Sequence, residues 1–391
     1  MNSLLVDSEH RVSTIELFFD LVFVFAFTQV TTLWHEQPTW AGLGRGLLVI
    51  CALWWAWASY AWLTNTADVQ ADSVLGIVLF ATGALFVAAL AVPEAFGAQR
   101  FVFAIAFFTV LASFVGLYAL VSRREPDLLA AVLRISWPVF AGAALIVAAA
   151  FTGTGWRPEI WLLALAIGFC GPLLTGLGGW RVFPAHFAER HGLIVIIAIG
   201  ESLGSIGFGA RDTPLDAQVI VAVVLGFLAA ASFWLAYFDY ASGSVGNLLA
   251  ERRGRERIAF ARDVYTYAHL PMVVGIVLFA FGVRTALAHV DEHLQLIPAL
   301  GLCWGPALYL FGFVALRWRA TRTVGRGRPI AAVGFALLTA AATHVSALVA
   351  LALVTAGWGA LHAYELIGWR EERARRRSEL AAAPELGDAH T

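Results

Sequence analysis

The sequence predicts an all-α fold, a polytopic bundle of about twelve transmembrane helices. Hydrophobic residues make up 60% of the 391 residues and charged residues 14%, whereas soluble domains are roughly half apolar and a quarter charged. Apolar runs of about 20 residues, the length that spans a bilayer, recur along the whole chain. The third observation is that arginines collect in alternate connecting segments.

The last apolar run, from Pro329 to Trp369, decides the number of helices. It is long enough for two helices, although no Pro or Gly-Asn signal marks a turn, and Thr343, His344 and Ser346 are the polar residues nearby. The alternative is a single final helix. The preferred prediction places helices at 15–34, 42–64, 74–93, 100–121, 133–152, 159–178, 189–209, 217–240, 263–285, 295–316, 329–345 and 348–369.

All 26 basic residues are arginines. With the N-terminus inside, the cytoplasmic segments hold 21 arginines and the opposite side holds 5. Because positive residues collect on the cytoplasmic side, both termini are predicted in the cytoplasm. A single final helix would place the five arginines of the tail outside. The absence of lysine excludes a retinal or pyridoxal Schiff base and a Walker A nucleotide site.

The predicted organisation is a cytoplasmic segment (1–14), the helix bundle (15–369) and a charged cytoplasmic tail (370–391), disordered after its first turn. No signal peptide is expected, because no basic region precedes a small-residue cleavage site. The three cysteines lie inside apolar runs, so neither disulfides nor a thiolate metal site are expected. The net charge of −1 argues against nucleic acid as a partner.

The halves 15–178 and 189–369 are candidates for a parallel repeat of six helices. An aromatic triplet on the second helix recurs on the eighth at a constant offset of 180 positions, and a glutamate opens both the first and the seventh helix. Aromatic residues are frequent here, so the match fits a repeat and chance equally. The matching residues are Trp54, Trp57 and Tyr60 with Trp234, Tyr237 and Tyr240, and Glu16 with Glu189.

Two carboxylates stand at the start of the first helix. Ser13 and Glu16 fit the S-x-x-E capping box, so local hydrogen bonding explains Glu16. Asp20 lies one turn deeper, where a charged carboxylate costs about 2.5–3.5 kcal/mol on insertion scales. Asp20 is therefore expected to face the bundle interior and meet a polar partner. The candidates are Arg190, Arg262, Asn65 and, across a shared proton, Asp239.

Glu201, in "IIAIGESLGSIGFG", is the deepest carboxylate of the predicted helices. Desolvation favours the neutral form of a glutamate at this depth. Ser202 could share a hydrogen bond with it, and Gly200, Gly204 and Gly207 would let another backbone approach. Glu201 is then either an ion or proton site between helices, or a structural hydrogen-bond hub, neutral or paired with arginine.

Further polar residues extend the candidate path to Gln29, Asp239 and His269, with Tyr265 as the expected partner of His269. For His269 a satisfied hydrogen-bonding role is favoured over a ligand role, and for Asp239 solvation at a loop edge fits equally well. No H-E-x-x-H spacing occurs. The one G-x-S-x-G match, from Gly200 to Gly204, lies inside a predicted helix, whereas a hydrolase elbow requires a strand-to-helix turn. The sequence therefore predicts no metal site, no cofactor and no enzymatic activity.

Four motifs carry a resemblance to a known family: "ELFFDLVFVFAFTQV", "ERHGLIVIIAIGESL", "WLAYFD" and "YTYAHLPMVVGIV". Together and in this order they resemble the bacterial low-temperature-requirement A (LtrA) family, from residue 11 to about residue 370. The resemblance implies a multi-helix integral protein of the bacterial cytoplasmic membrane, linked by name to growth in the cold, and implies no reaction. The family-type polar residues at the matching positions are Glu16, Asp20, Glu201, Ser202, Asp239 and His269.

The leading functional prediction is a secondary transporter or proton/ion-coupled permease, whose partners are the lipid bilayer and a small solute or ion. The first alternative is an ion channel or a structural, stress-related membrane protein. A lipid-acting enzyme is the least favoured class. An alternating cavity at Glu201 would favour the transporter, a continuous pore the channel, and a lateral cleft with several convergent polar groups the enzyme.

Overall fold

The computed structural model describes residues 4–6, 8–211, 213–239 and 242–382. This part of the chain is helical, with isolated bridges of Leu5 with Ala67 and of His293 with Ser346 in place of extended strands. Eleven of its helices are long and apolar enough to cross a membrane. The predicted all-α, polytopic helix bundle is confirmed.

The first half of the chain forms long helices joined by short connections. Proline fits the first turn of a helix, so the fifth helix begins at Pro126 and not at residue 133 as predicted. A short 3-10 turn, Val92–Glu94, follows the third helix. The helices are α1 (Thr14–Glu36), α2 (Trp40–Thr64), α3 (Asp72–Leu90), α4 (Arg100–Ser122), α5 (Pro126–Ala150) and α6 (Arg157–Leu174).

The second half contains two π-helical segments, Leu235–Asp239 after α8 and Ala261–Ala268 before α11. Two short helices, α9 and α10, lie where the sequence predicts a connecting segment, because their polar composition gives no membrane-span signal. The helices are α7 (Pro184–Ala210), α8 (Ala217–Trp234), α9 (Ser242–Glu251), α10 (Gly254–Phe260), α11 (His269–Ala288), α12 (Leu296–Thr321), α13 (Gly327–Ala342) and α14 (Ala347–Ala382).

The last apolar run divides into α13 and α14, as predicted, with the break at residues 343–346. At 16 residues, α13 is shorter than the about 20 that span a bilayer. α14 continues to Ala382, into the segment for which the sequence predicts disorder after the first turn of the tail. The alanines, glutamates and arginines of this segment favour helix. Residues 383–391 lie outside the described residues.

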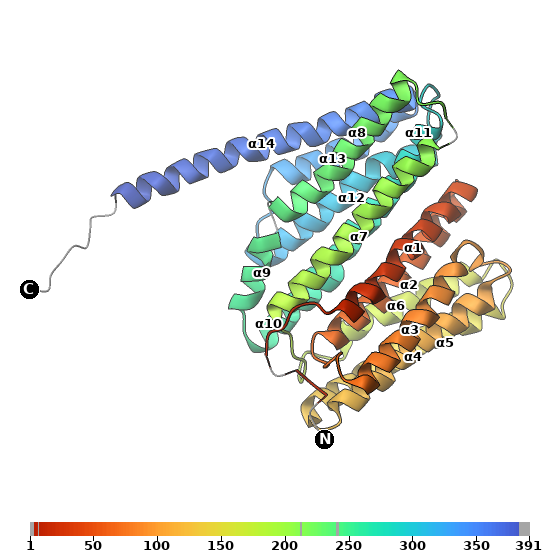
Figure 1. Cartoon of the computed structure of the whole chain (residues 1–391), viewed down its shortest axis with the longest axis vertical. Coiled ribbons are helices and arrows are strands. Elements are labelled where there is room, and N and C mark those ends of the chain that lie inside the picture. The colour runs from red at the N-terminus through yellow and green to blue at the C-terminus, as the bar shows by residue number, and fades with distance from the viewer. Residues whose placement is uncertain (1–3, 7, 212, 240–241, 383–391) are drawn as a thin grey trace, which may run out of the picture.

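α1–α6 lie together on one side of the molecule and α7–α14 on the other (Figure 1). In the first group α1 packs on α2 and α3, and the contacts continue from α3 to α4, α5 and α6, which returns to α2. In the second group α7 packs on α8 and α11, and the contacts continue from α11 to α12, α13 and α14, which returns to α8. This shared order of neighbours is what a parallel repeat predicts. The repeat stays a prediction, and Tyr240 of the matched triplet lies outside the described residues.

The groups meet where α1 packs on α7 and α11, and where α2 contacts the same two helices. Within the second group, α11 and α12 approach closely because glycines face each other. A Cβ at Gly282 would lie 2.2 Å from the Leu302 backbone nitrogen. The joint between α1 and α7, which we call the α1–α7 joint, holds most of the buried polar residues discussed below.

Candidate functional site

Ionisable side chains of α1 and α7 meet in the interior of the bundle. Arg190 donates from Nη1 to Glu16 Oε1 and from Nη2 to Asp20 Oδ1, each across 2.7 Å. His186 Nε2 lies 3.0 Å from Glu16 Oε1. All four side chains are fully buried. We call Glu16, Asp20, His186 and Arg190 the charge cluster. Both pairs have the i, i+4 spacing that places side chains on one helix face.

α2 closes the charge cluster with three polar side chains. Trp57 donates its indole N–H to Asp20 Oδ1 across 2.9 Å. Thr64 Oγ1 accepts from Arg190 Nη1 at 3.1 Å, and Asn65 meets His186 from the other side. The cluster is therefore held by α1, α2 and α7 together, although Arg190 and Asp20 are 170 residues apart in the sequence.

The hydrogen bonds of Asn65 determine the tautomer of His186. The Phe183 N–H donates to Asn65 Oδ1 across 2.8 Å, which fixes the orientation of the amide. Asn65 Nδ2 then donates to the Phe183 carbonyl and lies 3.1 Å from His186 Nδ1. His186 Nδ1 must therefore accept, and its Nε2–H donates to Glu16. This assignment makes His186 neutral, so two carboxylates face the one guanidinium of Arg190.

Two atoms of the charge cluster are buried without a hydrogen-bond partner among the described residues: Asp20 Oδ2 and Arg190 Nε. Buried polar atoms nearly always have a partner. Asp20 Oδ2 is thus an oxygen without a hydrogen-bond donor, in a site that holds two carboxylates and one guanidinium.

Glu16 also has the local role that the sequence predicts. Ser13 Oγ accepts from the Glu16 N–H, and the Glu16 side chain accepts from the Ser13 N–H at 2.9 Å, which completes the capping box. Its second role, the ion pair with Arg190, cannot be predicted from local sequence spacing. The single carboxylate joins the start of α1 to α7.

Glu201 forms a second polar contact across the α1–α7 joint. Its carboxylate accepts from Thr28 at 2.5 Å and from Thr31 at 2.8 Å, both on α1, and from Ser205 at 2.9 Å. The expected bond with Ser202 is wrong: Ser202 Oγ donates to the Ile276 carbonyl at 3.4 Å. Adjacent helical residues point to different faces, whereas Glu201 and Ser205 share one. None of the ion pairs among the described residues involves Glu201.

The glycines near Glu201 do not mediate close helix packing. Gly200, Gly204 and Gly207 are exposed, and a Cβ at any of them would meet nothing within 4 Å. They lie on the outer face of α7, away from the α1–α7 joint. Gly209 is the glycine in close contact, because a Cβ there would lie 2.5 Å from the Arg284 carbonyl oxygen.

His269 is fully buried and hydrogen-bonded at both ring nitrogens. Its Nδ1 lies 2.9 Å from the Val264 carbonyl and its Nε2 lies 2.9 Å from the Tyr237 hydroxyl. Nδ1–H therefore donates to the carbonyl, and Tyr237 donates to Nε2, which leaves the ring neutral. Tyr265, the expected partner, stacks on the ring with 5.1 Å between centroids but forms no hydrogen bond with it. His191 lies 5.2 Å from His269, ring to ring, and 4.8 Å from Trp57.

The chain matches the family model described as "Bacterial low temperature requirement A protein (LtrA)" over residues 11–363. That range contains the charge cluster, Glu201 and His269. The protein belongs to the LtrA family. An uncharacterized protein of Rhizobium meliloti (strain 1021) is 30% identical over 345 residues, which cover 84% of this chain and 82% of that protein. No solved structure matches the chain.

The remaining predicted site residues of this LtrA protein lie outside both polar sites. Arg262 pairs with Asp263 at 2.7 Å, so it is not the partner of Asp20. Asp239 is exposed at the end of its π-helical segment. Gln29 is half-buried and has no hydrogen-bond partner among the described residues.

Sequence reasoning missed several contributors to the LtrA site. His186, Trp57 and Thr31 all contact a buried carboxylate, and none was among the expected site residues. The spacing of four between His186 and Arg190 was the available signal for the first. The other two are recognisable only once α1 packs on α2 and α7. In the part of the chain that the structure describes, no group of three metal-binding side chains occurs.

Proposed function

We propose that this LtrA protein is a proton-coupled secondary transporter of a small solute, and that the charge cluster binds the coupling proton. The observation that carries the proposal is the free, buried Oδ2 atom of Asp20 beside a second carboxylate and one guanidinium. The proposal assigns no enzymatic reaction and no cofactor to the chain.

The charge balance of the cluster supports a proton site. With His186 neutral, ionised Glu16 and Asp20 together exceed the charge of Arg190 by one. An excess charge in a buried site is strongly unfavourable. A proton on Asp20 Oδ2 removes this excess and leaves Oδ1 free to accept from Arg190 and Trp57. Of the four carboxylate oxygens, Oδ2 is the one without a donor among the described residues.

The position of the cluster supports coupling to movement. Alternating access in transporters built from repeats is largely a rocking of one half against the other. The α1–α7 joint connects the two groups of helices, and Arg190 bridges it through both carboxylates. Protonation of Asp20 weakens one of the two charged contacts across the joint. The occupancy of the site thereby changes how strongly the halves attract each other.

The Glu201 site accommodates either protonation state. Thr28 Oγ1 lies within reach of both Glu201 Oε2 and the Val24 carbonyl, at 2.5 and 3.0 Å. The hydroxyl can donate to an ionised Glu201, or accept from a protonated Glu201 and donate to Val24. Because the Thr28 hydroxyl can exchange these two roles, Glu201 can gain or lose a proton without a change in how α1 packs on α7.

A structural clamp is the second candidate function, because buried ion pairs and hydrogen bonds across the α1–α7 joint also hold two groups of helices together. The two candidates differ in what Asp20→Asn does. Asparagine keeps an oxygen for Arg190 and Trp57 but cannot bind or release a proton. A clamp tolerates this change, whereas a coupling site does not.

Proteoliposomes containing a pH-sensitive dye separate the two functions. A panel of small solutes is added outside, and the transporter predicts that at least one solute changes the internal pH. Asp20→Asn should abolish that change, and Asp127→Asn, which alters an exposed carboxylate, should retain it. A solute-driven pH change of full size in Asp20→Asn would exclude the cluster as the proton site.

A further inference from the structure

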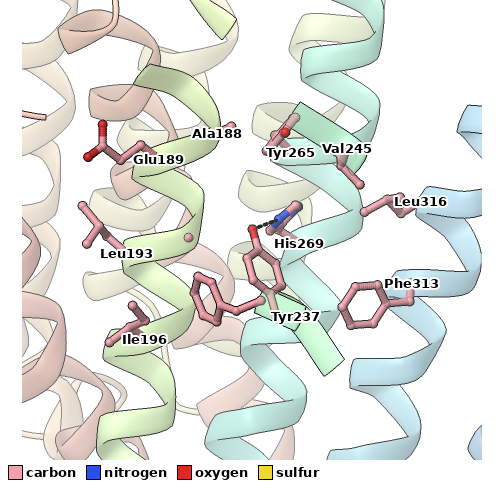
Figure 2. Close-up of a pocket in the computed structure, with 12 residues that line it drawn as sticks. Ala188, Glu189, Leu193, Ile196, Tyr237, Val245, Tyr265, His269, Phe313 and Leu316 are labelled. Atoms are coloured by element: carbon pink, nitrogen blue, oxygen red, sulfur yellow. Dashed lines mark hydrogen bonds between the residues drawn. The ribbon is translucent and has the colours of Figure 1, made fainter. Parts of the chain in front are cut away.

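A cavity of about 330 Å³ lies beside α7 (Figure 2). None of the four charge-cluster residues is among its described lining residues. It is bounded by α7, the Leu235–Asp239 segment, α9, α11 with the segment before it, and α12. Its volume is at the small end of the range for small-molecule sites. Ile196 on its border is 45% exposed, so the cavity is reachable from the surface of the bundle. Most of its lining is aromatic or aliphatic.

Both π-helical segments contribute to this cavity. Tyr237 and Phe238 belong to the first segment, and Tyr265 belongs to the second, with His269 directly after it. π-Helical turns make up well under 1% of residues in proteins and are frequent at functional sites. Two of them at one cavity are a second observation, independent of its shape, that points to a ligand site.

Side chains from other helices stabilise the two segments. Trp54 on α2 donates to the Thr266 carbonyl at 2.8 Å. Arg328 on α13 donates to the Ala236 carbonyl at 3.3 Å. The distorted turns are therefore held in place, and with them the tyrosines that line the cavity.

The cavity offers hydrogen-bond acceptors to an occupant. The Tyr237 hydroxyl uses its proton on His269, so its oxygen has only acceptor capacity left. The Tyr265 hydroxyl has no hydrogen-bond partner among the described residues, although the side chain is only 2% exposed. This oxygen is not among the fully buried polar atoms, so an occupant of the cavity can reach it. An ammonium group, which carries three N–H donors, could donate to both oxygens.

The charges around the cavity favour a cation. Glu189 at the rim is the one acidic side chain among the described lining residues, and its carboxylate also accepts from the Val12 N–H at 3.3 Å. The rings of Tyr237, Phe238 and Tyr265 present electron-rich faces, which attract cations. Phe313 is the fourth ring, and the Arg328 guanidinium lies 4.2 Å from its centroid. That arginine is paired with Glu365 at 2.7 Å, so it adds little net charge.

We propose that this cavity binds a small organic ammonium ion with an aromatic or branched apolar body. The N–H groups donate to the tyrosine oxygens, and the apolar body packs on the rings. If the protein is a transporter, as proposed above, this ammonium ion is the class of solute that it carries, and this part of the inference rests on the proposed function. Binding itself does not depend on transport.

The cavity and the charge cluster are close enough to be coupled. His191 lies between them, 5.2 Å from His269 and 4.8 Å from Trp57, measured between ring centroids. Trp57 in turn donates to Asp20. One layer of packed rings therefore separates a bound cation from the proposed proton site.

Three matched probes test the proposal by calorimetry on the full chain in detergent at neutral pH: 2-phenylethylammonium, neutral 2-phenylethanol and anionic phenylacetate. The ammonium ion should bind tightest, and the alcohol roughly 3- to 30-fold more weakly, the range that a cation–π contribution gives. Phenylacetate should show no saturable binding. Equal affinities for the three probes, or tightest binding of phenylacetate, would overturn the proposal.

Variants locate the binding. Glu189→Gln changes an exposed side chain and Phe238→Leu a half-buried ring. Both should weaken binding of the ammonium ion more than binding of the alcohol. Tyr265→Phe should weaken binding of both probes, because it removes the hydroxyl that has no partner among the described residues. Phe101→Leu, on α4 and outside the cavity, is the matched control and should change nothing. Thermal unfolding of each variant confirms the fold, and unchanged affinity in the three cavity variants would place the binding elsewhere.

Failure of this inference and failure of the proposed function are distinguishable. Binding is measured at equilibrium without a proton gradient, so Asp20→Asn should keep its affinity for 2-phenylethylammonium. Saturable, variant-sensitive binding without any proton flux would support the cavity and reject coupled transport.

Discussion

Arg190 on α7 donates to Asp20 on α1 across 2.7 Å, and neither side chain has exposed surface. The same guanidinium binds Glu16, so one residue holds both carboxylates of the first helix. Removal of one partner of a buried ion pair costs about 3–5 kcal/mol, because the other charge stays buried and unpaired. The stability of the α1–α7 joint thus depends on Arg190 and the two carboxylates compensating each other's charge.

Arg190→Met should therefore lower the free energy of unfolding by about 3–5 kcal/mol, since two carboxylates lose their cation. Adding Glu16→Gln and Asp20→Asn should recover part of this loss, because both remaining groups are then neutral. Thermal unfolding in detergent measures the three proteins side by side. If the triple variant unfolds as easily as Arg190→Met, the charge-balance explanation is wrong. The loss would then come from the packing of the Arg190 side chain.

Ser13→Ala should destabilise the chain by about 0.5–2 kcal/mol, the usual loss for an N-cap serine. The hydroxyl accepts from the Glu16 N–H and contacts the Glu16 carboxylate at 2.9 Å. Ser136→Ala removes a serine hydroxyl that bonds the Leu133 carbonyl in an exposed position, and serves as the control. Equal unfolding temperatures for the two variants would show that the capping box adds nothing measurable.

Gly282→Ala should be much more disruptive than Gly207→Ala. A Cβ at Gly282 would lie 2.2 Å from a backbone nitrogen of α12, which cannot move aside without shifting the helix. Overpacking of this kind costs about 1–3 kcal/mol or more. At Gly207 the space is open, and alanine favours helix over glycine by about 1 kcal/mol. Equal yields and unfolding temperatures for both variants would contradict the close α11–α12 contact.

The helical segments and the capping box were predictable because they depend on local composition and spacing. The expectation that Asp20 needs a partner was also sound, and Arg190 was among the four candidates. The partners of Glu201 were not identified, because Thr28 and Thr31 reach it only through the packing of α1 on α7. The preference for Ser202 ignored helix geometry, which places Ser205 on the same face.

The two π-helical segments could not have been predicted either. Their stabilising donors, such as Trp54 and Arg328, come from α2 and α13. Nothing in the local sequence "WLAYFD" or "ARDVYTYA" distinguishes a π-turn from a regular α-turn. In the tail, by contrast, two local signals disagree: the charged composition predicts disorder, whereas the alanines, glutamates and arginines favour the helix that α14 forms up to Ala382.

A reporter that is active only outside the cytoplasm, fused after residue 371, should remain inactive. The arginine distribution places both termini in the cytoplasm, which requires an even number of crossings. The eleven long helices satisfy this only if the shorter α13 also crosses. A fusion after Gly153, in the connection between α5 and α6, should be active and serves as the positive control. Activity at residue 371 would mean that α13 does not span the membrane.

Glu201→Gln should keep the fold and abolish proton-coupled activity. Glutamine retains an oxygen that accepts from Thr31 and Ser205, and its amide can donate to Thr28 while Thr28 donates to the Val24 carbonyl. It mimics a protonated glutamate and cannot release the proton. Glu201→Ala removes the acceptor from three hydroxyls, each worth about 0.5–1.5 kcal/mol. Thr28 and Thr31 can still donate to carbonyls of their own helix, which limits the loss.

The alanine variant should therefore lower the unfolding temperature, whereas the glutamine variant should match the wild type. Solute-driven pH change in proteoliposomes and growth rescue of a deletion strain are measured for both, at equal protein levels. If glutamine preserves both activities, and alanine fails only in proportion to lost protein, then Glu201 is a structural hydrogen-bond hub. If glutamine folds normally but loses both, the carboxyl proton is required, because the two side chains differ little in shape.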